Sequence, residues 1–260
     1  MSFSKTTLLT HIFNEEYLLP FWLNHHKDMF DEIIVVDYNS TDKSLEICKS
    51  ICPECKIIKS RNTDFGAIDV DREMMDIENC IEGIKIILNT TEFLFCETQI
   101  KDLFASYANP VSYSINGESP FSFKNYVPNN NYELFSNLLN NDIRYRSNFR
   151  GCRQIHNFPN GRYHPGRHQT NNPTTLTTDL HIIWLGYYPM NDDLMKRKLQ
   201  IQTRIPQTDL HAGMGTHHFF SKDHILSLNN EYVADGTSLE EINFKLYHLL
   251  SVKYSDLDGK

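Results

Sequence analysis

The chain has 260 residues, a formal net charge of −8, and 40% hydrophobic and 22% charged residues. This is the composition of a globular protein with one large domain or two small ones and a sizeable core. The acidic balance, with an isoelectric point near 5.8, argues against a general nucleic-acid binder, whose surface is usually basic. We therefore expect no nucleic acid among its partners.

The N-terminal segment predicts neither a membrane span nor a signal peptide. The sequence contains no run of about 18 apolar residues, the length that a span requires. Its first apolar run, residues 6–13, is followed at once by Glu15 and Glu16, which is typical of a buried strand. We therefore expect a cytoplasmic protein whose six cysteines are thiols.

The first sixty residues predict alternating strands and helices. Strands are expected over 6–13, 32–38 and 56–59, with helices over 15–29 and 44–51 between them. The run EIIVVDY at 32–38 contains four consecutive apolar β-branched residues, which is typical of a strand buried on both faces of a parallel sheet. Strand and helix alternating at this spacing predict a doubly wound α/β sheet.

The middle of the chain is less regular. We expect an amphipathic helix over 69–83 and one buried strand with a polar interruption over 84–95. The stretch 109–131 is rich in Asn, Ser and Pro and predicts a long loop or irregular strands.

The last part of the chain predicts one further strand and two helices. The strand covers 181–188, and the helices cover 191–205 and 238–251. We expect a single domain over 1–260 with a mostly parallel central sheet flanked by helices. Residues 1–108 form its ligand-binding half, and the irregular half, residues 109–260, takes a second substrate.

Three polar segments end the predicted strands, at 14–16, 37–42 and 89–92. In an open parallel sheet, ligands bind outside the carboxyl ends of the strands, near the point where the strand order reverses. Carboxylate and hydroxyl groups there suit a nucleotide base and ribose, with a cation near the phosphates.

These segments carry a family resemblance. HIFNEEYLLPFWLNHH (11–26), FDEIIVVDYNSTDKSLEI (30–47) and EFL (92–94) resemble the family 2 glycosyltransferases and the related family 92 group. The resemblance covers residues 6–95 and implies the Rossmann-like GT-A fold, which binds nucleoside-diphosphate sugars. It favours a UDP-sugar donor, a hydroxyl acceptor such as a glycan, and inversion at the anomeric carbon.

The resemblance also implies donor-binding residues. The residues after the first strand that it places along the nucleoside are His11, Phe13, Asn14 and Glu15. The segment that reads the base and ribose consists of Asp37, Tyr38 and Asn39. Tyr38 replaces a second aspartate of the family pattern; a tyrosine can stack on a base but lacks the acceptor pair of a carboxylate. A simple turn or cap is the alternative role for Asp37.

The family's metal-binding aspartates are missing. In the family the stretch D-V-D-E-F-L holds Mn²⁺ or Mg²⁺ against the diphosphate; here Asn89 and Thr91 replace both aspartates and only Glu92 is acidic. Amide and hydroxyl groups are weak substitutes for carboxylates as metal ligands. The late histidine of related metal sites is matched by Trp184, with His181 nearby. Metal dependence is therefore open, with Glu92 as the one candidate ligand.

Basic segments in the second half can neutralise a diphosphate instead. The loop 161–168 contains Arg167 and His168 among glycines, and 196–198 reads Lys-Arg-Lys. Arginine's planar fork suits phosphate oxygens, and glycine permits close approach of the backbone. An ordinary basic surface loop is the alternative.

An inverting transferase needs a carboxylate that takes the proton of the attacking hydroxyl. Asp209, flanked by histidines and glycines, is the first candidate, and Asp179 and Glu92 follow. A capping role is the alternative for Asp209. Two other functions stay open: a metal-dependent hydrolase using the C-terminal histidines, and an inactive relative that binds nucleotides or glycans.

Overall fold

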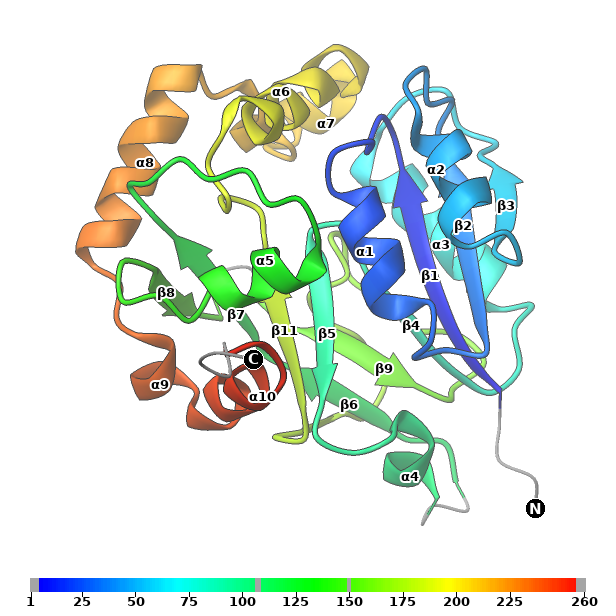
Figure 1. Cartoon of the computed structure of the whole chain (residues 1–260). Coiled ribbons are helices and arrows are strands. Elements are labelled where there is room, and N and C mark those ends of the chain that lie inside the picture. The colour runs from blue at the N-terminus through cyan, green and yellow to red at the C-terminus, as the bar shows by residue number, and fades with distance from the viewer. Residues whose placement is uncertain (1–4, 106–108, 149–150, 256–260) are drawn as a thin grey trace.

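The computed structural model describes residues 5–105, 109–148 and 151–255, which form two β-sheets surrounded by helices (Figure 1). The larger sheet has seven strands in the order β10-β6-β9-β4-β1-β2-β3. Its parallel centre consists of β4 (Ile84–Ile87), β1 (Thr6–Ile12), β2 (Glu32–Asp37) and β3 (Lys56–Lys59). The other three strands are β9 (Arg153–His156), β6 (Ser112–Ile115) and β10 (Thr175–Leu176). The predicted α/β fold with a largely parallel central sheet is confirmed.

Strand β2 explains why this sheet is a middle layer. Ile33 and Val35 belong to the main core, which also contains residues of α1 (Leu19–His26) and α2 (Ser44–Ile51). The alternate residues Ile34 and Val36 pack in a second cluster with residues of α3 (Ala67–Glu78). Because successive side chains of a strand point to opposite faces, an unbroken apolar run is what two covered faces require.

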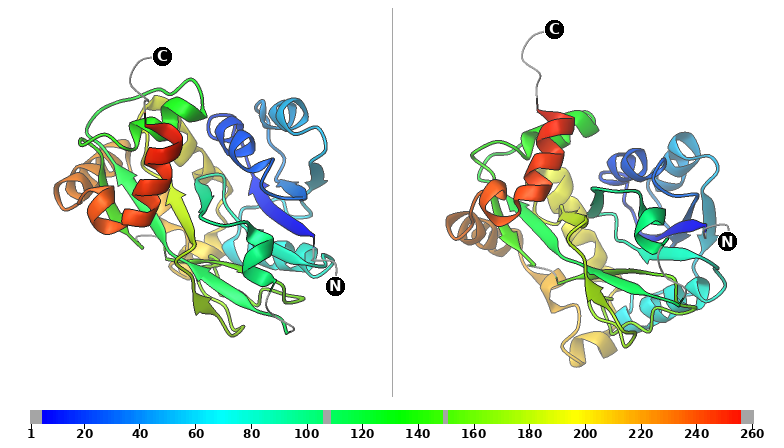
Figure 2. Two further views of the ribbon diagram at one scale, coloured as in Figure 1. Left: turned by 60° about the horizontal axis from the view of Figure 1, so that its bottom comes forward. Right: turned by 90° about the horizontal axis from the view of Figure 1, so that it is seen from below.

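The second sheet has four strands in the order β5-β11-β7-β8. Their bounds are β5 (Glu92–Cys96), β11 (Leu180–Trp184), β7 (Gly117–Phe121) and β8 (Arg144–Ser147). The helices beside this sheet are α5 (Asn131–Asn137), α8 (Lys222–Ala234), α9 (Leu239–Ile242) and α10 (Phe244–Tyr254). Figures 1 and 2 show α8 to α10 on the side of the molecule opposite α1 and α2, and Figure 1 also labels α4 (Ile100–Phe104).

The predicted strand over 84–95 is two strands in different sheets. β4 ends at Ile87 and pairs with β1, whereas β5 begins at Glu92 and pairs with β11. The turn between them is closed by the carboxylate of Glu92, whose Oε2 accepts from the backbone N–H of Asn89 at 2.8 Å. The polar interruption in the sequence is therefore the crossing point from one sheet to the other.

The stretch 109–131, predicted to be a long loop or irregular strands, contains the strands β6 and β7. One other prediction needs correction. The helix expected over 238–251 is broken into α9 and α10 at Asn243, whose side-chain Oδ1 accepts from Leu246 N–H at 3.1 Å and begins the second helix. The break occurs because Asn satisfies a free N–H group at a helix start.

A histidine pair joins α1 to β5. His25 Nε2 donates to the carbonyl of Leu94 at 2.6 Å, and His26 Nε2 accepts from Leu94 N–H at 3.1 Å. Burial lowers the pKa of His25 to about 4, and burial together with His25 also lowers the pKa of His26. Both rings are thus neutral near pH 7, the state in which His26 can accept, and they fix the strand that begins with Glu92.

The segment after β11 runs through short helices. These are α6 (Asp192–Gln200), a 3₁₀ turn (Ile201–Arg204), α7 (Gln207–His211) and a second 3₁₀ turn (Thr216–Phe219). Asn191 caps α6 by accepting from Leu194 N–H at 2.9 Å, as its sequence position predicts. No helix among the described residues is long and apolar enough to cross a bilayer.

Candidate functional site

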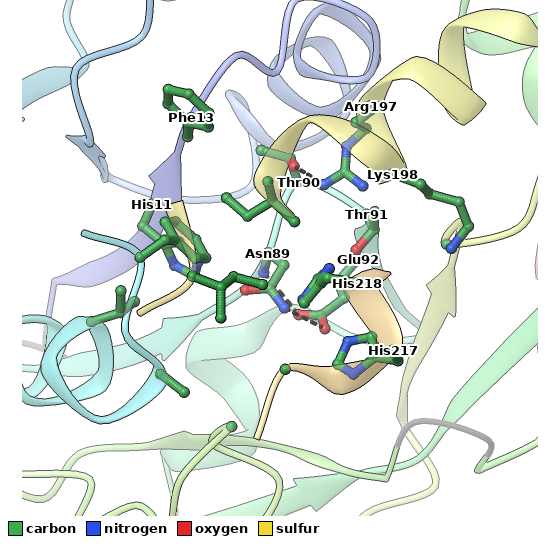
Figure 3. A pocket seen from close by; sticks show the side chains of 18 of the residues that line it. His11, Phe13, Asn89, Thr90, Thr91, Glu92, Arg197, Lys198, His217 and His218 are labelled. Atoms are coloured by element: carbon green, nitrogen blue, oxygen red, sulfur yellow. Dashed lines mark hydrogen bonds between the residues drawn. The ribbon is translucent and has the colours of Figure 1, made fainter. Parts of the chain in front are cut away.

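A cavity of about 310 Å³ lies at the carboxyl ends of β1 and β4. β1 continues to β2 and β3 on one side, while β4 lies on its other side, so the strand order reverses here. A crevice at such a reversal is where ligands bind in open α/β sheets. The opposite wall comes from β11, α6, α7 and the 3₁₀ turn over Thr216–Phe219, and Figure 3 shows this arrangement.

The end of β1 supplies His11, Phe13 and Glu15 to the cavity. The ring of His11 lies 5.4 Å from that of Phe65, so this corner is aromatic. Burial, together with the charges of three nearby arginines, holds the pKa of His11 well below its usual value. His11 is therefore neutral near pH 7 and can act as both donor and acceptor.

The floor of the cavity is the stretch Asn89–Glu92, and its acid is fully engaged. Arg153 binds both oxygens of Glu92, at 2.9 Å from Nε to Oε2 and at 2.6 Å from Nη2 to Oε1. Burial favours the neutral form of Glu92, but the charge and hydrogen bonds of Arg153 outweigh it and the pKa lies below its usual value. Glu92 is thus an anion balanced by a guanidinium.

Two further buried or nearly buried ion pairs repeat this pattern. Arg167 pairs with Asp71 of α3, and Arg197 Nη2 of α6 lies 2.6 Å from Glu15 Oε1. The three arginines meet the floor: Arg167 donates to Asn89 Oδ1 at 2.9 Å, and Arg197 to Thr90 Oγ1 at 3.3 Å. Desolvated pairs of this kind cost several kcal/mol to break by removing one partner.

The wall opposite the floor combines cations with aromatic rings. Lys198 of α6 lies over the ring of Tyr187, with its Nζ 3.7 Å from the ring centroid. Trp184 and Tyr187 line the cavity and contact each other at 5.8 Å between ring centroids. Figure 3 places Lys198 on the same side as Arg197, with His217 and His218 below them.

Most of the residues predicted for the site line this cavity. They are His11, Phe13, Glu15, Asn89, Thr91, Glu92, Arg167, His168 and Asp209. Of the acids expected to meet along one rim, Glu15 and Glu92 do so, but Asp37 is not among the lining residues. Residues from 11 to 209 are thus brought to one place by the fold.

The residues predicted at the end of β2 do not line the cavity. They form a turn and contribute one ring to the core. Asp37 Oδ1 accepts from Ser40 N–H at 3.0 Å, and Asn39 has a left-handed backbone with φ of 62°. The hydroxyl of Tyr38 donates to Glu73 Oε2 at 2.7 Å, so its ring is directed into the core. Asn14 likewise bonds this turn, with Oδ1 accepting from Thr41 N–H at 2.7 Å.

Asp179 lies away from the cavity. It precedes β11 at the end where Leu180 pairs with Cys96, whereas the cavity is at the other end, where Trp184 pairs with Glu92. A strand of this length separates the two ends by roughly 16 Å. Its carboxylate Oδ1 lies 3.5 Å from Lys245 Nζ, so Asp179 is not brought together with the other predicted site residues.

Asp209 lines the cavity and also caps a helix. Its Oδ2 accepts from Ala67 N–H at 2.6 Å, at the first residue of α3. This is the capping role considered as the alternative, reached across 142 positions of sequence. Its other oxygen, Oδ1, has no hydrogen-bond partner among the described residues.

The sequence did not point to several cavity residues. Asp71 occurs in a helix whose charged positions suggested solvent, and Arg153 begins a short strand that was not predicted. Tyr187 was predicted only as part of a strand, and Trp184 was considered only as the match to a metal-binding histidine, not as an aromatic wall of the cavity. The available signal was a charged residue within a predicted helix or a short polar segment, and its meaning depended on a partner far along the chain.

A divalent cation does not fit this floor. Glu92 uses both oxygens on Arg153, and Asn89 Oδ1 accepts from Arg167, so neither offers a free donor to a metal. Each carboxylate near the floor is already balanced by a guanidinium group, which leaves no excess of negative charge to attract a divalent cation. Within residues 5–105, 109–148 and 151–255, no three His, Cys, Asp or Glu side chains form a group that could hold a metal ion.

The histidines considered for a hydrolase or a metal site do not form a metal-binding group either. His181, expected near the metal, bonds Glu97 at 3.1 Å on β11 and does not line the cavity. The ring centroids of His217 and His218 lie 4.1 Å apart. A metal site would need at least one more His, Cys, Asp or Glu side chain beside them, and no such group of three occurs among the described residues. The hydrolase alternative therefore lacks a ligand set in this part of the chain.

No protein-family model and no curated protein matches the chain. Among solved structures, TarS 1–349 from S. aureus is similar at 20% identity and a TM-score of 0.35, over 48% of this chain and 38% of that one. The same protein in complex with UDP-GlcNAc gives a TM-score of 0.34 at 20% identity, over 48% of this chain and 37% of that one.

A second similar structure is glucosyl-3-phosphoglycerate synthase from Mycobacterium tuberculosis with Mn²⁺, UDP and glucosyl-3-phosphoglycerate. The identity is 14% and the TM-score 0.28, over 35% of this chain and 34% of that one. This chain thus spans little more than a third of these proteins. Likenesses this slight carry no activity over to it.

Proposed function

We propose that the cavity binds a nucleoside-diphosphate sugar and that the protein transfers the sugar to a hydroxyl acceptor, with a UDP-sugar as donor, a glycan as acceptor and inversion at the anomeric carbon. The supporting observation is the place and content of the cavity. It opens at the reversal of strand order, where a neutral histidine, aromatic rings and several cations meet.

The donor's parts match different walls. The aromatic corner of His11, Phe13 and Phe65 suits a base and ribose, because a planar base stacks on rings and a neutral histidine can donate or accept. The cationic wall suits the diphosphate. Trp184 and Tyr187 offer apolar ring faces, against which the C–H face of a sugar can pack.

Asp209 is the proposed base. Its Oδ2 is fixed by Ala67 N–H, which leaves Oδ1 to take the proton of the attacking hydroxyl. The acceptor oxygen then bonds the anomeric carbon as the bond from that carbon to the diphosphate oxygen breaks, and the nucleoside diphosphate leaves with the electron pair.

The test is transfer from a panel of UDP-, GDP- and dTDP-sugars to oligosaccharides, followed by mass spectrometry. Asp209→Asn keeps an oxygen for Ala67 N–H but cannot take a proton. We expect it to lower the rate by about 10²–10⁴-fold while leaving unfolding and donor affinity unchanged. An equal rate for Asp209→Asn and the parent chain would remove Asp209 as base.

One observation favours a second function, nucleotide binding without turnover. Glu92 is bound to Arg153, Asp179 lies away from the cavity, and Asp209 caps α3. The same panel separates the two functions. Binding of a nucleotide with no release of nucleoside diphosphate over any acceptor or water would favour the binding protein.

A further inference from the structure

The cavity floor has cations where a metal-dependent transferase has carboxylates. Arg167 contacts Asn89, Arg197 contacts Thr90 and Arg153 contacts Glu92, so three guanidinium groups meet one four-residue stretch. Each arginine also has a carboxylate partner, and the three pairs together are neutral. Guanidinium N–H groups, rather than carboxylates that could hold a metal ion, therefore surround this stretch.

Helix α6 places two neighbouring cationic side chains, Arg197 and Lys198, at the cavity. Arg197 gives Nε and Nη2 to Glu15 and Thr90, whereas its Nη1 makes no hydrogen bond within the described residues. Its side chain is 18% exposed and lines the cavity. Lys198, the next residue, lines the same cavity and is held there by the ring of Tyr187.

We propose that Arg197 and Lys198 bind the diphosphate of the donor in place of a divalent cation, opposite the stretch Asn89–Thr91. This rests on the proposed function and specifies how that site holds its ligand. Side-chain cations fixed by ion pairs and by a ring replace an ion that would have to be recruited from solution. Charge on the leaving diphosphate is then stabilised by groups already in position.

Helix α6 also provides the control. Lys196 precedes Arg197 but does not line the cavity; its side chain is 75% exposed and its Nζ lies 3.7 Å from Glu16. Lys196→Gln and Lys198→Gln remove the same charge from the same helix. Arg197 is left intact in the test, because its removal would leave the carboxylate of Glu15 without its ion-pair partner.

The experiment is isothermal titration calorimetry of the whole chain with UDP, uridine and inorganic pyrophosphate, each in EDTA and in Mn²⁺. We expect UDP affinity to agree within about twofold between EDTA and Mn²⁺. Lys198→Gln should lower the affinity for UDP and for pyrophosphate by about tenfold, because one charge-assisted contact is lost. The affinity for uridine should be unchanged. Lys196→Gln should match the parent chain, and unaltered thermal unfolding shows that both variants fold.

The possible failures can be told apart. UDP binding at least tenfold tighter in Mn²⁺ than in EDTA, or equal effects of Lys196→Gln and Lys198→Gln, would overturn metal-free diphosphate binding and leave the proposed function standing. Pyrophosphate binding that depends on Lys198 without any binding of UDP would overturn the proposed function and keep the diphosphate site. Binding of neither would overturn both.

Discussion

The two sides of the cavity differ in charge and in origin. The carboxylates Glu15, Asp71 and Glu92 come from the first 92 residues, and their partners Arg197, Arg167 and Arg153 come from residues 153–197. Each segment supplies the ion-pair partners of the other. The carboxylates in the first 92 residues therefore depend for their ion-pair partners on a part of the chain in which sequence patterns are weak.

The largest effect is expected from breaking the best-buried of these pairs. Arg153→Met keeps an apolar stem but leaves Glu92 without its cation, which should destabilise the fold by about 3–5 kcal/mol. Chemical unfolding of the variant measures this. The exposed pair of Arg61 and Asp76 is the control, since Arg61→Met should cost at most about 1 kcal/mol. Equal costs for the two variants would mean that the two sides of the cavity are not coupled through Arg153.

The acidic side should also respond to pH through the histidines that hold β5. The pKa of His25 is lowered to about 4 in the fold, against roughly 6.5 when unfolded. The unfolded chain therefore takes up the proton first, and stability is present above pH 6.5 and lost as pH falls toward 4. The loss from this group is about 3 kcal/mol.

Chemical unfolding between pH 7 and 4 tests this, with His25→Gln as the variant. Glutamine can still donate to Leu94 but does not titrate, so the loss of stability over that range should shrink by about 3 kcal/mol. The same substitution at an exposed histidine, His248→Gln, is the control for the loss of an imidazole as such. An unchanged slope in His25→Gln would contradict the buried, neutral histidine.

The smallest effect is expected at Asp37. Its carboxylate accepts from Ser40 N–H and does not line the cavity, although the family resemblance implies contact with base and ribose. Asp37→Asn keeps the acceptor, so UDP affinity by calorimetry should change less than twofold. A loss of tenfold or more would return Asp37 to the donor site and extend that site to the end of β2.

The sequence predicted the elements whose neighbours are close in the chain. The run at 32–38 and the helices around it follow from apolar periodicity, because β2 is buried by α1, α2 and α3 on its two faces. The stretch 84–95 was misassigned because nothing local shows that its two ends join different sheets.

The sequence predicted the cavity residues that lie at the ends of strands. His11, Glu15 and Glu92 were found because polar residues after buried strands meet at one edge of a sheet. Asp71 and Arg153 were not found, because a charge within a helix or a short strand predicts a buried ion pair only when its partner is known. Those partners lie 61 residues apart for Glu92 and Arg153, and 96 for Asp71 and Arg167.

The most direct measurement is a crystal structure of the chain soaked with UDP. We expect uridine beside His11 and Phe13, with the diphosphate between Asn89–Thr91 and Lys198 (Figure 3). Electron density for UDP on another face of the molecule, or an empty cavity at millimolar UDP, would contradict it.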